Sequence, residues 1–191
     1  MEPSTASTPP LLGDVDERRA RTIGLRVGIS LLVVVFATFW TWALFFASKE
    51  AVNRIGDRAW ADRAELICQD AKDSLVEMAD FREIRDAGPE LIVERAAIVD
   101  TATDILDRMV DDVAAVDPAD RKGSQIVPLW EADYRVYLQD RRNFADQLRA
   151  SGENLAFYET AADGIPVSER IETFAGDNDM PACAPPRDLT R

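Results

Sequence analysis

The chain has 191 residues, of which 30% are charged and 47% are apolar, and its net charge at neutral pH is −13. The excess lies after residue 48, where 31 acidic residues face 18 basic ones. A surface this acidic repels phosphate backbones, which argues against nucleic acid as a partner. The chain contains no histidine, so it lacks the commonest general base and the commonest metal ligand, and we expect no metal site and no cofactor.

Residues 1–26 are predicted to form a disordered tail. The first fourteen of them are rich in serine, threonine and proline, a composition typical of segments that do not fold by themselves. The rest of the tail carries a compact group of basic residues, Arg18, Arg19, Arg21 and Arg26. We expect this tail to lie in the cytoplasm.

Residues 27–48 form a run of 22 residues without a charge. As a helix this run would span about 33 Å, which is enough to cross the hydrocarbon core of a membrane. A buried core helix is seldom so long and so uniformly apolar. A cleavable signal peptide would need small residues before its cleavage site, whereas Leu44 and Phe45 are bulky. The run therefore predicts one transmembrane signal-anchor helix, with the membrane as its partner.

The orientation of this helix does not follow from counting charges. Four basic residues precede the run and four follow it closely, namely Lys49, Arg54, Arg58 and Arg63, so the positive-inside rule gives a tie. The arginines before the run are more tightly clustered. Together with the cysteine argument below, this favours a single-pass protein with a cytoplasmic N-terminus and an extracytoplasmic domain.

Residues 49–151 show three amphipathic helical patterns. The first runs from Ser48 to about residue 86, with Gly56 as a soft point, and its apolar stripe is Trp60, Ala64, Ile67, Ala71, Leu75 and Met78. The second covers about residues 90–116, begins near Pro89, and has the apolar stripe Ile98, Ala102, Ile105, Met109, Val113 and Val116. The third covers about residues 125–150 and carries Val127, Trp130, Tyr134, Tyr137, Leu138, Phe144 and Leu148, with Gly152 as its C-terminal cap.

Three such helices joined by short loops predict a mainly α fold, an antiparallel three-helix bundle with up-down-up order. Residues 152–191 are predicted to be an extension packed on this bundle. We expect a short hairpin that turns at Asp163–Gly164, followed by a short helix that Ser168 begins and Gly176 ends. Its expected anchors on the bundle are Phe157, Ile171 and Phe174.

The chain has two cysteines, Cys68 in the first predicted helix and Cys183 in a proline-rich segment near the C-terminus. That segment has no periodic pattern and cannot hold itself in place by secondary structure. A disulfide would fasten it to the bundle, and disulfides persist in oxidising compartments. We predict a Cys68–Cys183 bond and an extracytoplasmic domain. The alternative is two unrelated buried thiols.

Four aspartates, Asp100, Asp104, Asp107 and Asp111, share one face of the second predicted helix. Carboxylates at this spacing can bind hard cations. A solvated helix face is the more ordinary interpretation, and we expect it here because the glycine and terminal glutamate of a calcium loop are missing.

Arg141 falls within the apolar stripe of the third predicted helix, together with Trp130, Tyr134 and Tyr137. An arginine at a core-facing position needs a partner. One interpretation is structural, with Arg141 stacked on an aromatic ring and bonded to an acid or a carbonyl of the C-terminal segment. The other is a pocket for a small anionic ligand.

Two functional hypotheses follow. The first is a membrane-tethered interaction module, an accessory subunit or scaffold of the cell envelope with a protein partner. The second is an extracytoplasmic sensor domain that binds a small anionic ligand near Arg141. An envelope hydrolase is a distant third hypothesis, because no serine stands in a nucleophile motif and no histidine is present to activate one.

Overall fold

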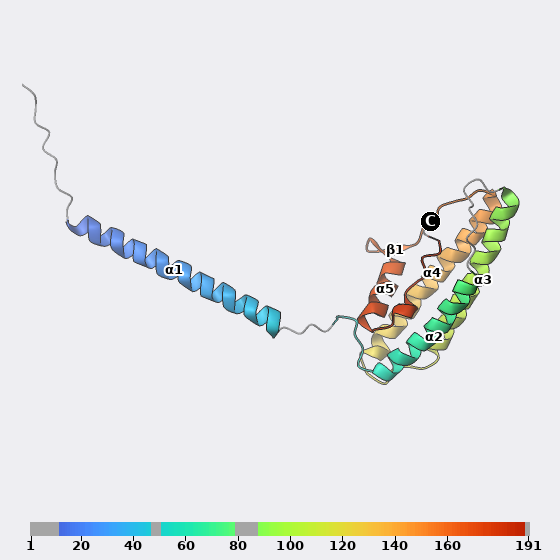
Figure 1. The fold of residues 1–191 in the computed structure, drawn as a ribbon, viewed down its shortest axis with the longest axis horizontal. Helices are drawn as coiled ribbons and strands as arrows, with labels where there is room; N and C mark the ends of the chain where they lie inside the picture. Colours follow the sequence, from blue (N-terminus) through green and yellow to red (C-terminus); the bar gives the residue numbers. More distant parts are fainter. Residues whose placement is uncertain (1–11, 47–50, 79–87, 190–191) are drawn as a thin grey trace, which may run out of the picture. The chain divides into compact units, whose positions relative to one another are not determined.

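The structure is a computed structural model that describes residues 12–46, 51–78 and 88–189, with the backbone alone for residues 12–20. The chain divides into two compact units, Met1–Lys49 and Glu50–Arg191. The first unit contains helix α1 (Leu12–Phe45), and the second contains every other element that the described residues form. The chain is mainly helical, as the sequence predicts (Figure 1).

Helix α1 extends further toward the N-terminus than the predicted membrane span. It begins at Leu12, so residues 12–26 are helical and the prediction of a disordered tail is wrong for them, whereas residues 1–11 lie outside the described residues. The alanine, arginine and glutamate that precede the apolar run favour helix, and extending an existing helix avoids the cost of nucleation. Within α1, Arg21–Phe45 is long and apolar enough to cross a membrane, and all but one of its side chains are exposed.

Helix α2 (Arg58–Glu77) is shorter than the sequence predicts. The expected helix from residue 48 is wrong for residues 51–57, which are not helical, and residues 79–87 lie outside the described residues. Asp57 begins α2 instead, because its Oδ1 atom accepts a hydrogen bond from the backbone N–H of Trp60 at 3.0 Å. Trp60, Ala64 and Ala71 of the predicted stripe are buried, as is Cys68.

Helix α3 (Pro89–Ala114) begins with a proline at its first position, as predicted. Its buried face is wider than the predicted stripe, because α3 packs against both α2 and α4. Val99, Leu106 and Val110 are buried although the predicted stripe omits them, whereas Val116 at its end is exposed.

Helix α4 (Gly123–Ser151) carries the predicted stripe without change, and every residue of that stripe is buried. It ends at Gly152, which has a left-handed φ of 66° and caps the helix as expected.

The chain after α4 forms the predicted hairpin, with strands of only two residues each. Strands β1 (Ala161–Ala162) and β2 (Ile165–Pro166) pair antiparallel around Asp163 and Gly164, whose φ angles are both positive. Helix α5 (Val167–Asp177) follows and extends beyond both predicted ends. Ser168 lies inside it rather than capping it, since its N–H and hydroxyl both donate to Glu159, and Gly176 also lies inside it.

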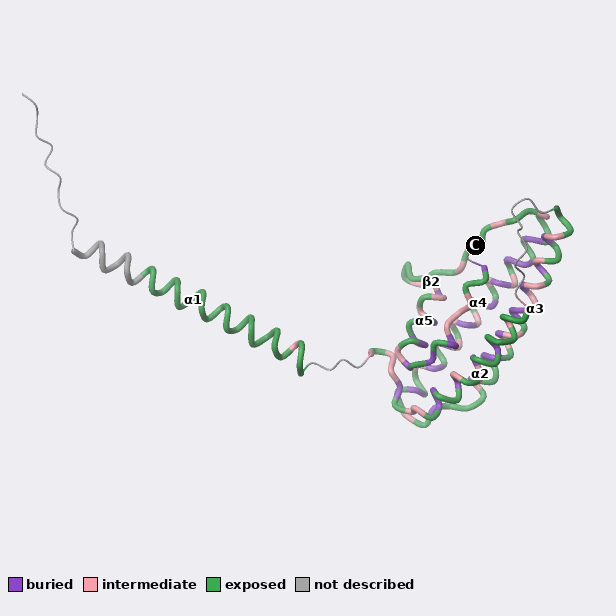
Figure 2. Tube along the Cα trace, viewed as in Figure 1, coloured by how far each residue is buried: buried purple, intermediate pink, exposed green. Residues whose placement is uncertain are grey.

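The C-terminal segment is part of the core, not an addition to its surface. The larger cluster of buried residues takes side chains from α2, α3, α4, α5 and the 3₁₀ turn η1 (Pro181–Cys183). Among them Ile171, Met180 and Cys183 have no exposed area. A boundary between a bundle at residues 49–151 and an extension at 152–191 therefore divides one hydrophobic core (Figure 2).

Candidate functional site

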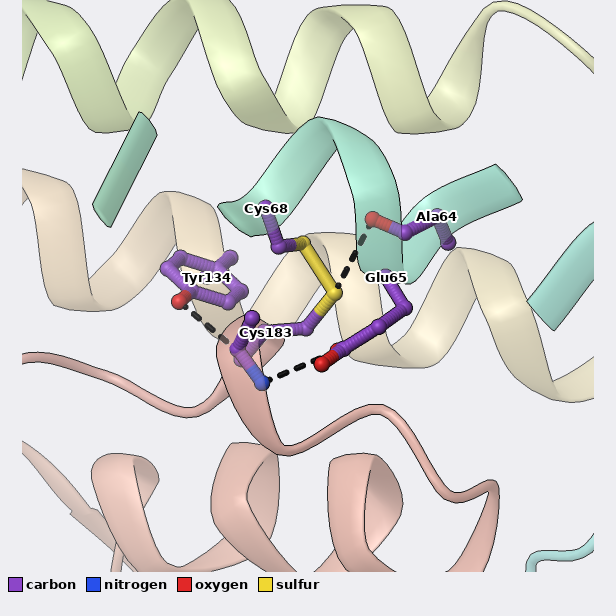
Figure 3. Close-up of a disulfide and its surroundings, with 6 residues drawn as sticks. Ala64, Glu65, Cys68, Tyr134 and Cys183 are labelled. Carbon is purple, nitrogen blue, oxygen red and sulfur yellow. Dashed lines mark hydrogen bonds between the residues drawn. A yellow bond between two sulfur atoms is a disulfide. The ribbon is translucent and has the colours of Figure 1, made fainter. Parts of the chain in front are cut away.

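The Cys68–Cys183 disulfide is present and joins α2 to η1 across 115 positions of sequence. The two Cα atoms lie 5.0 Å apart, and neither cysteine has exposed area. The backbone N–H of Ala182 donates to Glu65 of α2 at 2.9 Å (Figure 3). The Cys183 sulfur lies 3.4 Å from the carbonyl oxygen of Ala64, a packing contact because a disulfide sulfur carries no proton.

The segment that follows the disulfide runs along one row of side chains on α4. Tyr134 donates its hydroxyl proton to the carbonyl oxygen of Cys183 at 3.0 Å, and Tyr137 donates to the carbonyl oxygen of Pro186 at 3.2 Å. One turn further on, Arg141 binds the carboxylate of Asp188. We call Tyr134, Tyr137 and Arg141 the donor row. The spacing of three and four residues puts the row on one face of α4, so the C-terminal segment contacts it in sequence order.

Arg141 is completely buried and holds Asp188 in a two-pronged ion pair. Its Nη1 and Nη2 atoms each lie 2.8 Å from one carboxylate oxygen of Asp188, which keeps 40% of its side chain exposed. Nε donates to the hydroxyl of Thr103 on α3 at 3.1 Å, and the guanidinium carbon lies 5.7 Å from the centre of the Tyr137 ring. Burial opposes the charge, but the hydrogen bonds and attraction of Asp188 outweigh burial and raise the pKa of Arg141 above its ordinary value.

The other predicted members of this site have different neighbours. Trp130 packs against Tyr134 and against Phe174 of α5, with ring centres 5.1 and 5.9 Å apart. Burial raises the pKa of Tyr134 and Tyr137, so both phenols stay protonated and remain donors at physiological pH. The structure therefore brings Tyr137 to Arg141 and directs Tyr134 to the disulfide, while Trp130 fills the core below α5.

A groove of about 330 Å³ lies beside the donor row. Its lining residues are Tyr137, Phe157, Glu159, Ser168, Glu172, Pro185, Pro186, Arg187 and Leu189. Its carboxylates are engaged within the chain: Glu159 accepts from Ser168 at 2.8 Å, and Glu172 accepts from Arg187 at 3.0 Å.

The four aspartates of α3 keep 33–64% of their side chains exposed, on the solvated face that the sequence predicts, but this face also carries ion pairs. They pair with arginines of α4, and the two series run in opposite directions: Asp100 with Arg149, Asp104 with Arg142, Asp107 with both Arg142 and Arg135, and Asp111 with Arg135. The hydrogen bond that Arg142 donates to Asp104 is the main reason that the pKa of Arg142 is raised. These side chains are about one third exposed or more, so each pair stabilises the fold only modestly. Among the described residues, no group of three or more ligand-type side chains could hold a metal ion.

A second network fastens the segment before α2 to the end of α5. The side chain of Asn178, which is fully buried, accepts from the N–H of Ile55 at 2.8 Å and donates to the carbonyl oxygens of Asn53 and Phe174. Asp179 pairs with Arg54 and Arg58, and Asp177 accepts from Asn53. We call Asp177, Asn178 and Asp179 the latch. The latch explains why residues 51–57 leave the helical path that the sequence predicts.

The sequence analysis missed several of these groups. It predicted an acid or a carbonyl of the C-terminal segment as the partner of Arg141, and the partner is Asp188 of that segment. It did not identify Asp188 itself, because nothing in the local pattern distinguishes this residue from the other acids. It also missed Thr103 and the latch. Residues 51–57 show no helical repeat of apolar residues, and this absence could have predicted that the segment before α2 is not helical. No protein-family model, no curated protein sequence and no solved structure matches the chain.

Proposed function

We propose that this chain is a single-pass membrane protein whose disulfide-closed helical domain lies in an oxidising extracytoplasmic compartment and acts as an interaction module, an accessory subunit or scaffold of the envelope. In this proposal α1 is a signal anchor with its N-terminus in the cytoplasm. The domain has the three long helices in up-down-up order, closed by the C-terminal segment.

The observation that carries the proposal is the disulfide. It lies wholly inside the core, and the segment that it fastens supplies further core residues, so the core contains a bond that reducing compartments do not maintain. The apolar helix α1 supports membrane attachment by its length, its composition and its exposure. In addition, the hydroxyls of Thr38 and Thr41 donate to carbonyl oxygens one turn earlier, which satisfies these polar groups without water.

The test has three readouts on intact cells and isolated membranes. The protein should resist extraction by alkaline carbonate and should stay with the membrane fraction at full length, as a signal anchor requires and a cleaved signal peptide does not. A membrane-impermeant maleimide should label neither cysteine before reduction. Protease added outside the membrane should degrade the domain. Recovery of the full chain in the soluble fraction, or two thiols that react only after lysis, would contradict the proposal.

The ligand-sensing alternative is a second candidate because the groove lies directly beside the donor row. An anionic ligand would have to displace Asp188, which already holds both prongs of Arg141. Melting of the purified full chain in acetate, succinate and phosphate tests this candidate. A rise in melting temperature that Arg141→Met abolishes would favour the sensor, and the interaction module predicts no specific rise.

A further inference from the structure

The outward face of α4 differs from every other exposed helix face in the described part of the domain. Each exposed residue of α4 from Ser124 to Asn143 is uncharged. The exposed faces of α2, α3 and α5 all carry charged residues, such as Asp70, Glu94 and Glu172. In a chain of net charge −13, an exposed face of about five helical turns without a charge is a distinct surface.

The residues of this face repeat at heptad spacing. Gln125, Leu129, Ala132, Val136, Gln139 and Asn143 follow one another at intervals of four and three, as the a and d positions of a coiled coil do. We call these six residues the α4 outer face. Leu129 is 60% exposed and Val136 is 38% exposed, so both present apolar area to solvent. The next position of the repeat is Asp146, which ends the uncharged face and pairs with Arg149 of its own chain.

The charges at the e and g positions beside this face are separated by sign, although Glu131, at a c position, lies on the same side as Arg135 and pairs with it. With Leu129 at an a position, Arg135 and Arg142 occupy g positions on the side toward α3, and Asp133 and Asp140 occupy e positions on the side toward α5. Within the chain, Asp133 pairs with Arg170 of α5 at 3.0 Å, and Arg135 pairs with Asp107 of α3. These ion pairs hold the flanking side chains in place, with the arginines of the g positions on one side of the face and the aspartates of the e positions on the other.

We propose that the α4 outer face is the contact surface between two copies of this chain, paired parallel about a two-fold axis. Two acidic domains repel one another, and this face is where they can approach without placing like charges in contact. A parallel pair brings Arg135 of one copy beside Asp140 of the other. An antiparallel pair would bring the g-position arginines of the two copies together, and their e-position aspartates likewise. Asn143, at an a position, would fix the register.

The proposal rests on the proposed function and deepens it, because it names a partner for the interaction module. Attachment would assist it: two anchored copies share one orientation, as a parallel pair requires, and a high effective concentration. The contact surface is small and partly polar, so we expect a weak pair that forms mainly in the membrane.

Disulfide cross-linking of the full chain in lipid vesicles tests the proposal. Ala132→Cys should give several-fold more cross-linked dimer than Ala97→Cys, the same change at an exposed position of α3. Adding Val136→Glu to the Ala132→Cys chain should abolish the dimer, and so should Gln139→Glu, which adds a charge without changing shape. Val93→Glu, at an exposed valine of α3, should leave the dimer intact. The native disulfide is buried and should not interfere, and a melting curve of each variant verifies that it is folded.

Three outcomes would overturn the pairing. The first is equal cross-linking of Ala132→Cys and Ala97→Cys, which would indicate random collision. The second is a dimer that survives Val136→Glu in a folded chain. The third is efficient cross-linking between a Gln125→Cys chain and an Asn143→Cys chain, which would indicate an antiparallel pair. Flotation of the chain with the vesicles reports membrane attachment separately, so failure of the anchor and failure of the pairing can be distinguished.

Discussion

Removal of the Cys68–Cys183 bond gives the most direct test of how the domain is held together. The loop that the bond closes is 115 residues long, nearly the whole of the unit Glu50–Arg191. In the chain-entropy description, closing a loop of this length lowers the entropy of the unfolded chain and so raises its free energy by about 5 kcal/mol. Removing the bond should cost the folded domain the same amount of stability. For a domain of this size, such a loss lowers the melting temperature by about 15–20 °C.

The assay compares the oxidised and reduced forms of one protein. The purified full chain is unfolded in urea with and without dithiothreitol, and near-ultraviolet circular dichroism follows the packing of the domain's aromatic core. The variant Cys68→Ala/Cys183→Ala should reproduce the reduced form and should not respond to dithiothreitol. Because the hydrogen bonds from Tyr134 and Arg141 to the C-terminal segment survive reduction, the reduced domain should keep its helical content under native conditions.

A difference of less than about 1 kcal/mol between the unfolding free energies of the oxidised and reduced forms, the lower part of the range seen for disulfides, would contradict this prediction. Such a result would mean that the C-terminal segment is held by its noncovalent contacts alone. Loss of helical content on reduction would also contradict the prediction. It would show that the donor row cannot hold the segment without the bond.

Three further predictions concern the polar contacts of the domain. Asp188→Ala should cost about 3 kcal/mol in urea unfolding, because it leaves the buried charge of Arg141 unpaired, and the double variant Arg141→Met/Asp188→Ala should recover part of that loss. Asn178→Ala should cost about 3 kcal/mol for its three side-chain hydrogen bonds, and should speed amide hydrogen exchange in the segment before α2. Hydrogen bonds from the backbone N–H of Ala119, and then of Trp60, lower the pKa of Asp57. A carboxylate with a lowered pKa in the folded state contributes stability that is present above about pH 4 and is lost as the pH falls through the folded-state pKa. Between pH 5 and pH 2, the melting temperature should therefore fall less steeply for Asp57→Asn than for the control Asp112→Asn.

Apolar periodicity predicted α4 well because that helix has one continuous buried face. Val127, Tyr134, Arg141 and Leu148 lie at intervals of seven, and α3 and α5 cover the two sides of this line. Periodicity was less successful for α3, which lies between α2 and α4 and buries a wider arc than one stripe. Here a stripe chosen by spacing alone includes Val116 and omits Leu106.

Long-range polar contacts were beyond the sequence analysis for a different reason. The cysteine pairing could be predicted because only two cysteines exist, so that one pairing is available. For Arg141, the chain contains 35 acidic residues that could be its partner. Its pairing with Asp188 depends on the path of the C-terminal segment after the disulfide. The aspartates of α3 were correctly predicted to face solvent, but a single helix considered alone cannot show that a neighbouring helix places arginines opposite them.

The position of Cys183 in a proline-rich segment follows from these contacts. Pro185 and Pro186 have no N–H to satisfy and favour an extended backbone, so the segment suits a surface that offers hydrogen-bond donors rather than acceptors. The donor row of α4 is such a surface, since its phenols and guanidinium all donate toward the segment. The same segment reaches α2 through the disulfide and through Glu65. It therefore joins α2 to α4, and this closure is the reason that a chain without regular structure there belongs to the core.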